Sequence, residues 1–183
     1  MKRLFFAAWP PDSWRRELSS AVAPALAGLR GRMQSGADWH LTLCFLGNVD
    51  ERLLGPLCQR AGDIRLPAFT VVFDCLRYWR EPRVLVATLS RYVAPESAVG
   101  LVRALTSTAI ALGVQPDARP WLPHLTLARG VSPEVWAEQA SSGELPLPAV
   151  QWSVDAFHLA ESRVVDGRRY QLLASWPLRA GGQ

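Results

Sequence analysis

The chain has almost no lysine. Of its 20 basic residues, 19 are arginines and Lys2 is the only lysine. A Walker A loop needs a Gly-Lys pair, and the sequence contains none. The same shortage leaves no central lysine to carry a covalent nucleotide. These absences argue against a reaction that consumes ATP.

Long hydrophobic runs are missing as well. No apolar stretch approaches the roughly 18–20 residues that span a bilayer. The N-terminal apolar run is short and meets Pro10, Pro11 and Asp12, and it lacks the longer core and cleavage site of a signal peptide. We therefore expect a cytoplasmic protein with no membrane partner.

Metal-ligand patterns are also absent. The three cysteines, Cys44, Cys58 and Cys75, are odd in number, contain no CxxC pair and match no zinc-finger spacing. No HExxH motif occurs. Small buried hydrophobic side chains are the expected role of these cysteines, and no cofactor is expected.

The composition is that of a soluble globular protein. The 183 residues are 49% hydrophobic and 20% charged, which fits one domain or two small lobes sharing a core. The net charge of +4 is carried almost wholly by arginine, whose planar guanidinium suits phosphate recognition. A nucleic-acid partner is compatible with this bias, but a genomic preference for arginine codons explains it equally well. Nothing requires more than a monomer.

Hydrophobic periodicity predicts alternating strands and helices. Strands are expected at 3–9, 37–47, 66–78, 83–90, 119–130, 145–162 and 168–178, and helices at 12–29, 50–61, 95–113 and 132–143. Gly47 and Asn48 are expected to form the turn that follows the second strand.

This order of elements is repeated. Residues 3–78 and 83–160 both run strand, helix, strand, helix, strand, and the second strand of each contains HLTL. We interpret them as two similar half-domains, with a weak linker around 79–82 and a closing strand at 168–178.

The two HLTL tetrapeptides, at 40–43 and 124–127, carry the candidate chemistry. Side chains on a strand alternate between faces, so His40 and Thr42 share one face and the leucines share the other. His124 and Thr126 are paired in the same way. If the half-domains face each other, the cleft holds two proton-exchanging imidazoles and two hydroxyl donors, which suits a phosphate.

These motifs carry a resemblance to a known family. The opening RLFFA, WHLTLCFLG, PHLTLAR and a late Gly167…Tyr170…Trp176 pattern resemble the two-histidine phosphoesterases. Within them the chain is most similar to the bacterial RNA 2′,3′-cyclic phosphodiesterases, historically called 2′-5′ RNA ligases.

The resemblance implies an α+β, bilobal fold of two pseudo-symmetric half-domains, with antiparallel sheets lining a central cleft and helices outside. It implies no metal, a proton-donor role for His40 and a proton-acceptor role for His124. The expected reaction opens RNA 2′,3′-cyclic phosphates to 2′-phosphates, with ligation without ATP as its reverse. The expected partners are RNA ends, such as tRNA halves, or small cyclic nucleotides.

Several further residues are candidates for supporting roles. Arg129 follows the second motif and could bind phosphate, but strict alternation from His124 would turn it away unless a bulge or strand end intervenes. Asp38 could orient His40 or merely mark the strand entry. His158 lies outside any HxT motif and is expected to be structural. Candidates for stacking a terminal base, all of which could instead be core residues, are Phe5, Phe45 and Tyr170.

Two other functions remain open. One is a metal-dependent phosphohydrolase, with His40 and His124 joined by Cys44, His158 or Asp38 as third ligand. The other is a non-catalytic module that binds RNA ends, which would have no need for two matched acid–base groups. Activity in excess chelator distinguishes these alternatives.

Overall fold

The computed structural model describes residues 1–91, 93–140, 142–165 and 168–179. Its strands are β1 (Lys2–Ala8), β2 (Arg32–Met33), β3 (Leu41–Val49), β4 (Phe69–Trp79), β5 (Val84–Thr88), β6 (His124–Arg129), β7 (Glu144–Val154), β8 (Ala156–Val165) and β9 (Arg168–Pro177). The α-helices are α1 (Asp12–Leu26), α2 (Leu54–Gly62), α3 (Glu96–Ala111) and α4 (Pro133–Gln139), and short 3₁₀ helices occupy η1 (Gly36–Asp38) and η2 (Glu51–Leu53). Within the described residues, no helix is both long and apolar enough to cross a membrane.

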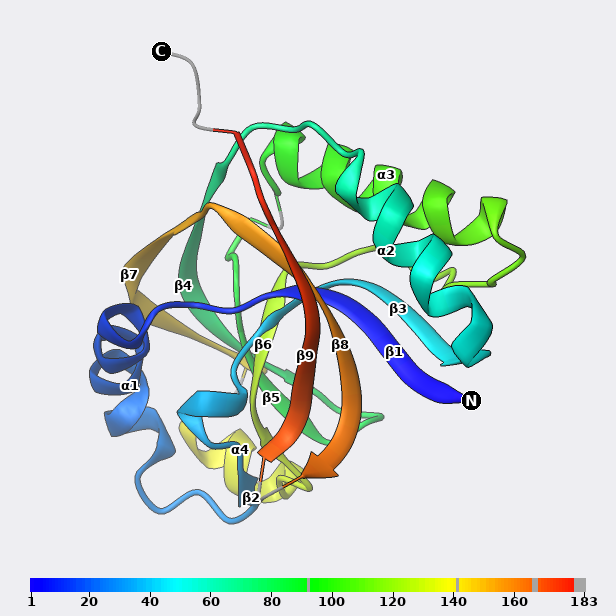
Figure 1. Cartoon of the computed structure of the whole chain (residues 1–183). Helices are drawn as coiled ribbons and strands as arrows, with labels where there is room; N and C mark the ends of the chain where they lie inside the picture. The colour runs from blue at the N-terminus through cyan, green and yellow to red at the C-terminus, as the bar shows by residue number, and fades with distance from the viewer. Residues whose placement is uncertain (92, 141, 166–167, 180–183) are drawn as a thin grey trace.

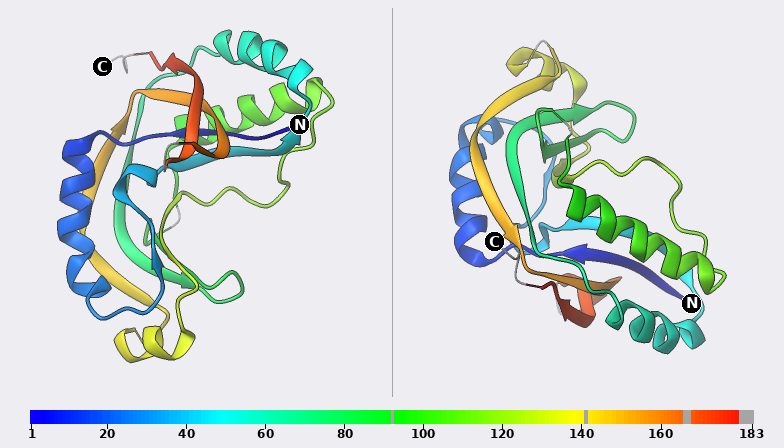
Figure 2. Two further views of the ribbon diagram at one scale, coloured as in Figure 1. Left: turned by 60° about the horizontal axis from the view of Figure 1, so that its bottom comes forward. Right: turned by 90° about the horizontal axis from the view of Figure 1, so that it is seen from above.

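The strands form two antiparallel sheets (Figure 1). One sheet has the order β3-β1-β8-β9, and the other has the order β2-β6-β5-β4-β7. Helix α1 packs against β7, and α3 packs against β3, so the helices lie on the outer sides of the sheets (Figure 2). The expected α+β fold with two antiparallel sheets is confirmed.

The sheets do not follow the half-repeats. Strand β4, from the first repeat, lies in the sheet built by the second repeat, and β8 pairs with β1 of the first. The expected single stretch 145–162 is therefore wrong, because it divides at Asp155 into β7 and β8 in different sheets. The residues of the main core explain the break: they are the even-numbered Val150, Trp152 and Val154 before Asp155 and the odd-numbered Phe157 and Leu159 after it.

The structure also differs from the prediction at two expected connections, residues 79–82 and residues 47–48. Residues 79–82 do not link two lobes but belong to a hairpin, in which Trp79 of β4 pairs with Val84 of β5. Gly47 and Asn48 form no turn, because β3 continues to Val49. A bulge lets it do so: Leu4 pairs with Gly47 and the next residue of β1 pairs with Phe45, while Gly47 takes a φ of 70°, which glycine adopts without strain.

Both HLTL strands begin at or just after their histidine. The preceding residues 37–40 and 119–123 were expected as strand but contain part of η1 and an irregular segment, respectively. Pro120 and Pro123 lack the N–H that a strand ladder uses, which accounts for the later start of β6.

The main core lies between the helices and the faces of the sheets that the helices cover. The HLTL leucines Leu41, Leu43, Leu125 and Leu127 are at most 1% exposed and belong to this core. Burying each of these side chains contributes roughly 1.5–3 kcal/mol. Their burial fixes the faces of β3 and β6, so the histidines and threonines must point the other way.

Candidate active site

The two HLTL motifs open onto one small cavity of about 80 Å³. Its lining contains the five residues expected from the sequence, namely His40, Thr42, His124, Thr126 and Arg129, together with Gln34, Asp38 and Tyr170. The cavity is polar and close to the size needed for one phosphate group and its hydrogen-bond partners.

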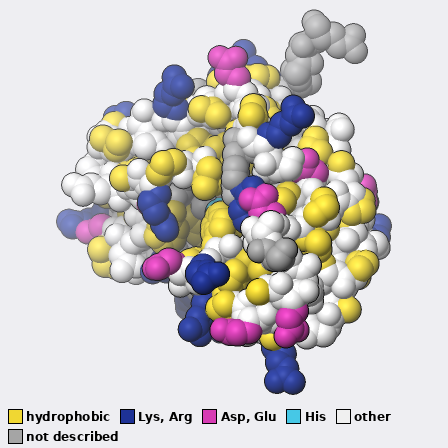
Figure 3. Space-filling model, turned by 180° about the vertical axis from the view of Figure 1, so that it is seen from behind, with side chains coloured by type: hydrophobic (Ala, Val, Ile, Leu, Met, Phe, Trp, Pro, Cys, Tyr) yellow, Lys and Arg dark blue, Asp and Glu magenta, His cyan; other side chains and the backbone are white. Residues whose placement is uncertain are grey.

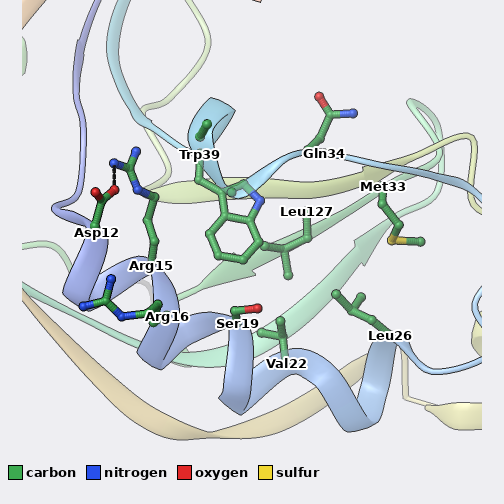
Figure 4. A pocket seen from close by; sticks show the side chains of 12 residues that line it. Asp12, Arg15, Arg16, Ser19, Val22, Leu26, Met33, Gln34, Trp39 and Leu127 are labelled. Atoms are coloured by element: carbon green, nitrogen blue, oxygen red, sulfur yellow. Dashed lines mark hydrogen bonds and ion pairs between the residues drawn. The ribbon is translucent and has the colours of Figure 1, made fainter. Parts of the chain in front are cut away.

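A larger cavity of about 520 Å³ lies elsewhere, between α1 and the segment around β2 (Figure 4). Neither histidine lines it. Gln34 lines both cavities, and in Figure 4 its side chain points away from those of Met33 and Leu127, which line the larger cavity alone. The two spaces therefore adjoin at Gln34, and only the smaller one is lined by histidines.

The same backbone contact orients both histidine rings. His40 Nδ1 lies 2.7 Å from the carbonyl oxygen of Asp38, and His124 Nδ1 lies 2.7 Å from that of Leu122. A carbonyl oxygen can only accept, so each Nδ1 carries a proton and donates it. Nε2 is then the atom of each ring that can exchange a proton with substrate. Asp38 thus orients His40 through its backbone carbonyl rather than its carboxylate.

Burial controls the charge of both rings. Desolvation lowers the pKa of His40 to about 4, and the nearby charges of His124 and Arg129 add to this, against the opposing effect of the Asp38 carbonyl. Desolvation also lowers the pKa of His124, and Arg129 acts in the same direction. Both imidazoles are therefore neutral at neutral pH in the free protein.

Arg129 reaches the cavity because β6 contains a bulge. Leu85 pairs with Ala128 and Val86 with Thr126, which leaves Leu127 as an extra residue. Leu127 and Ala128 are consecutive buried residues, and Arg129 returns to the face of the histidine. The bulge that a phosphate-binding role for Arg129 requires is therefore present.

A matching bulge occurs in β3. Phe6 pairs with Cys44 and Ala7 with Thr42, so Leu43 is the extra residue and Phe45 returns to the face of His40. Phe45 and Arg129 thus occupy equivalent positions, five residues after their histidines. The two sides of the cavity are alike in the motif and different in this residue.

Aromatic side chains surround the histidines. The Trp9 ring stacks on that of His40 with centroids 4.9 Å apart, and Tyr170 meets His40 edge-on at 4.7 Å. The ring centroids of Trp79 and His124 are 4.5 Å apart. Among the stacking candidates, Phe5 is only 3% exposed and packs against His40, so no base can stack on it. The half-buried Phe45 lies beneath the guanidinium of Arg3, and Tyr170 lines the cavity.

Sequence reasoning missed Gln34, Trp9 and Trp79. Alternation along β1 could have found Trp9, because Phe5, Ala7 and Trp9 share a face opposite Leu4 and the other core residues of that strand. No local pattern places Gln34 or Trp79 beside the histidines, since both come from other strands or their extensions.

The remaining sequence candidates lie outside the cavity. His158 Nδ1 is 2.7 Å from Ser175 Oγ, and burial lowers the pKa of His158. Cys44 is buried, and desolvation raises the pKa of its thiol to about 11. In the described ranges, no three His, Cys, Asp or Glu side chains gather as metal ligands would. In the C-terminal pattern Gly167…Tyr170…Trp176, Trp176 stacks on Phe157 in the core, and Gly167 lies outside the described residues.

The fold and the paired histidines define a phosphoesterase class, and comparison with known proteins agrees. The sequence-family model of the LigT-like phosphoesterases matches residues 9–86. The chain is 34% identical over 180 residues to the RNA 2′,3′-cyclic phosphodiesterase of Escherichia coli, covering 97% of each. It is 34% identical over 141 residues to that of Bacillus subtilis, covering 68% of this chain and 71% of the relative.

Solved structures give the same result. The crystal structure of E. coli LigT complexed with 3′-AMP superposes with a TM-score of 0.80 at 31% identity, covering 97% of each chain. This chain belongs to the RNA 2′,3′-cyclic phosphodiesterase family of LigT-like phosphoesterases. The family resemblance expected from the sequence is thereby confirmed.

Proposed function

We propose that this protein hydrolyses RNA 2′,3′-cyclic phosphate ends to 2′-phosphomonoesters by acid–base catalysis that needs no metal. The observation that carries the proposal is the pair of imidazoles in one small cavity, each with Nδ1 tied to a backbone carbonyl and Nε2 left for substrate. Two threonine hydroxyls and a guanidinium from the same lining can stabilise the phosphoryl oxygens.

The proposed reaction is a single in-line displacement at phosphorus. The neutral His124 ring accepts a proton from water as the water oxygen attacks the cyclic phosphate. The bond from phosphorus to the ribose 3′ oxygen breaks, and the His40 imidazolium donates its proton to that oxygen. The products are a 3′-hydroxyl and a 2′-phosphate, and the proton on His124 returns to His40 through solvent. The same steps in the same direction, with an RNA 5′-hydroxyl in place of water as the nucleophile, would join two RNA ends through a 2′-5′ bond without ATP.

The protonated donor must arise when substrate binds. Both rings are neutral in the free protein near pH 7, because burial lowers their pKa values. A cyclic phosphate carries one negative charge, and its approach favours a protonated imidazole. Binding an anionic substrate would thus create the donor at the site where it is used.

The relatives support the substrate class. The E. coli, Geobacillus stearothermophilus and B. subtilis proteins are named RNA 2′,3′-cyclic phosphodiesterases, and E. coli LigT has been solved with 3′-AMP and with phosphate. RNA ends, including tRNA halves, and small cyclic nucleotides are the proposed substrates here. We place the protein in the cytoplasm as a monomer.

One experiment tests this function against the alternatives. A defined oligoribonucleotide with a 2′,3′-cyclic phosphate is incubated with enzyme in excess EDTA, and the product is identified by phosphorus NMR against 2′- and 3′-phosphate standards. We expect full turnover to the 2′-phosphate. Activity lost with EDTA and restored by zinc or manganese would establish a metal enzyme. Binding without turnover would establish a binding module, and a 3′-phosphate product would reverse the roles given to the histidines.

A further inference from the structure

Net charge alone does not locate the path of a bound RNA chain. On the face shown in Figure 3, arginine and lysine side chains are spread over the surface and do not form one patch. A specific path must therefore be inferred from basic residues that share the catalytic face. Strand β2, at the edge of its sheet, supplies one such residue.

Arg32 of β2 is paired directly with Arg129 of β6. Directly opposed residues of an antiparallel ladder are about 5 Å apart at Cα, and their side chains point to the same face. Arg129 lines the histidine cavity, so Arg32 lies on the same face one strand further out. The neighbouring residues agree: Gln34, two positions on, lines this cavity as well as the larger one, whereas Met33 between them lines only the larger one.

This pairing places two positive charges side by side. Like charges directly opposite each other in a ladder destabilise a sheet. Among the ion pairs of the described residues, none includes Arg32 or Arg129. Arg32 is exposed at the strand edge, so its guanidinium is accessible. Paired, accessible guanidiniums of this kind are suited to an anion that arrives with the substrate.

We propose that Arg32 binds the phosphodiester next to the reacting phosphate, on the 5′ side of the terminal nucleotide. The inference rests on the proposed function, since Arg129 would hold the terminal cyclic phosphate and Arg32 the phosphodiester that precedes it in the RNA. An oligonucleotide has this second phosphate, whereas a nucleoside 2′,3′-cyclic phosphate does not. Arg32 would thus make the enzyme prefer RNA ends over cyclic mononucleotides.

The test compares the two kinds of substrate in one variant. Arg32→Gln should raise KM about fivefold for a short oligonucleotide with a 2′,3′-cyclic phosphate, the loss expected for one exposed guanidinium–phosphate contact. For adenosine 2′,3′-cyclic phosphate, KM and kcat should stay within about twofold of wild type. The plot of log KM against log salt for the oligonucleotide should become shallower by about 0.7, the value for one phosphate contact on a single strand. Arg32→Lys should retain this salt dependence.

The matched control is Arg103→Gln on α3. It removes the same charge from an exposed position on a helix that packs against the core side of β3. It should leave KM and kcat unchanged for both substrates. The melting temperature of Arg32→Gln should equal or exceed that of wild type, because a like-charge pair is relieved. An equal loss on both substrates, or no loss on either, would overturn the role of Arg32. A wild-type enzyme that opens neither substrate would instead overturn the proposed function, and the inference with it.

Discussion

The pH dependence of catalysis should report the charge states of the two cavity histidines. A two-histidine reaction needs one neutral ring and one protonated ring. Burial lowers the pKa of His40 to about 4 and depresses that of His124, so near pH 7 the free protein has two neutral rings. The reactive form of the free protein is then a minor species, and acidification should increase it.

The size of the effect follows from the lowered pKa of His40 and from Coulomb's law. With a pKa of about 4, the His40 ring is protonated in roughly one molecule in a thousand at pH 7. A phosphate charge about 4 Å from the ring contributes about 4 kcal/mol at an effective dielectric constant of ~20, which corresponds to about a thousandfold in proton affinity. The bound substrate can therefore restore the pKa of His40 to near neutrality. Because kcat/KM reports the free enzyme and kcat the complex, the alkaline limb of kcat should lie at higher pH than that of kcat/KM.

Steady-state kinetics on a cyclic-phosphate oligonucleotide from pH 4.5 to 9 measures both profiles. We expect the kcat/KM optimum below pH 6.5, where both lowered pKa values lie, with limbs that belong to the coupled pair rather than to either ring. A denaturation measurement at each pH, made alongside the kinetics, controls for unfolding of the protein. Coincident alkaline limbs would refute the electrostatic role of the bound phosphate. A flat profile from pH 5 to 9 would refute acid–base catalysis by histidine.

Three further predictions concern single residues. His40→Ala and His124→Ala should each lower kcat by roughly 10²–10⁴ while circular dichroism stays native, whereas His158→Ala should retain most activity; an equal loss in all three would reveal a third essential histidine. Arg129→Gln removes a charge that depresses the pKa of both rings, so the alkaline limb of kcat/KM should move to higher pH while kcat falls about 10²-fold, and an unmoved limb would contradict this. Because the folded-state pKa of His40 lies below its unfolded value, the unfolded chain binds the proton more tightly, and stability is lost as pH falls from about 6.5 towards 4. The loss in the free energy of unfolding should reach up to about 3 kcal/mol. Urea denaturation should therefore show a smaller difference in this free energy between pH 7 and 4.5 for His40→Gln than for wild type. An equal difference in the two proteins would assign the acid sensitivity to other groups.

Local periodicity was sufficient to predict the faces of the two HLTL strands. Alternation assigned Leu41 and Leu125 to the core and the adjacent histidines to the opposite face, and both leucines are fully buried. This inference needs no knowledge of partners, because side-chain direction along a strand is a property of the strand itself. The duplication of the motif then indicated that two such faces meet.

Features that depend on strand pairing could not be predicted in this way. The bulge that turns Arg129 into the cavity exists only in the register between β6 and β5. The contact of Trp79 with His124 joins β4 to β6, which are not adjacent in the sheet. The exchange of β4 and β8 between the repeats is likewise a tertiary choice, and the change of parity at Asp155 was its only trace in the sequence.

The proposed roles of the two histidines rest on what differs around two equal motifs. At equivalent positions, the β6 side has the charged Arg129 and the β3 side has the aromatic Phe45, with Trp9 and Tyr170 close by. An anionic phosphate is attracted to the first side, and a ribose and its base are better accommodated by the second. The departing oxygen belongs to the ribose and so lies towards His40, while attack in line must come from the opposite side. This arrangement favours His40 as the donor, and it requires no difference between the two imidazoles themselves.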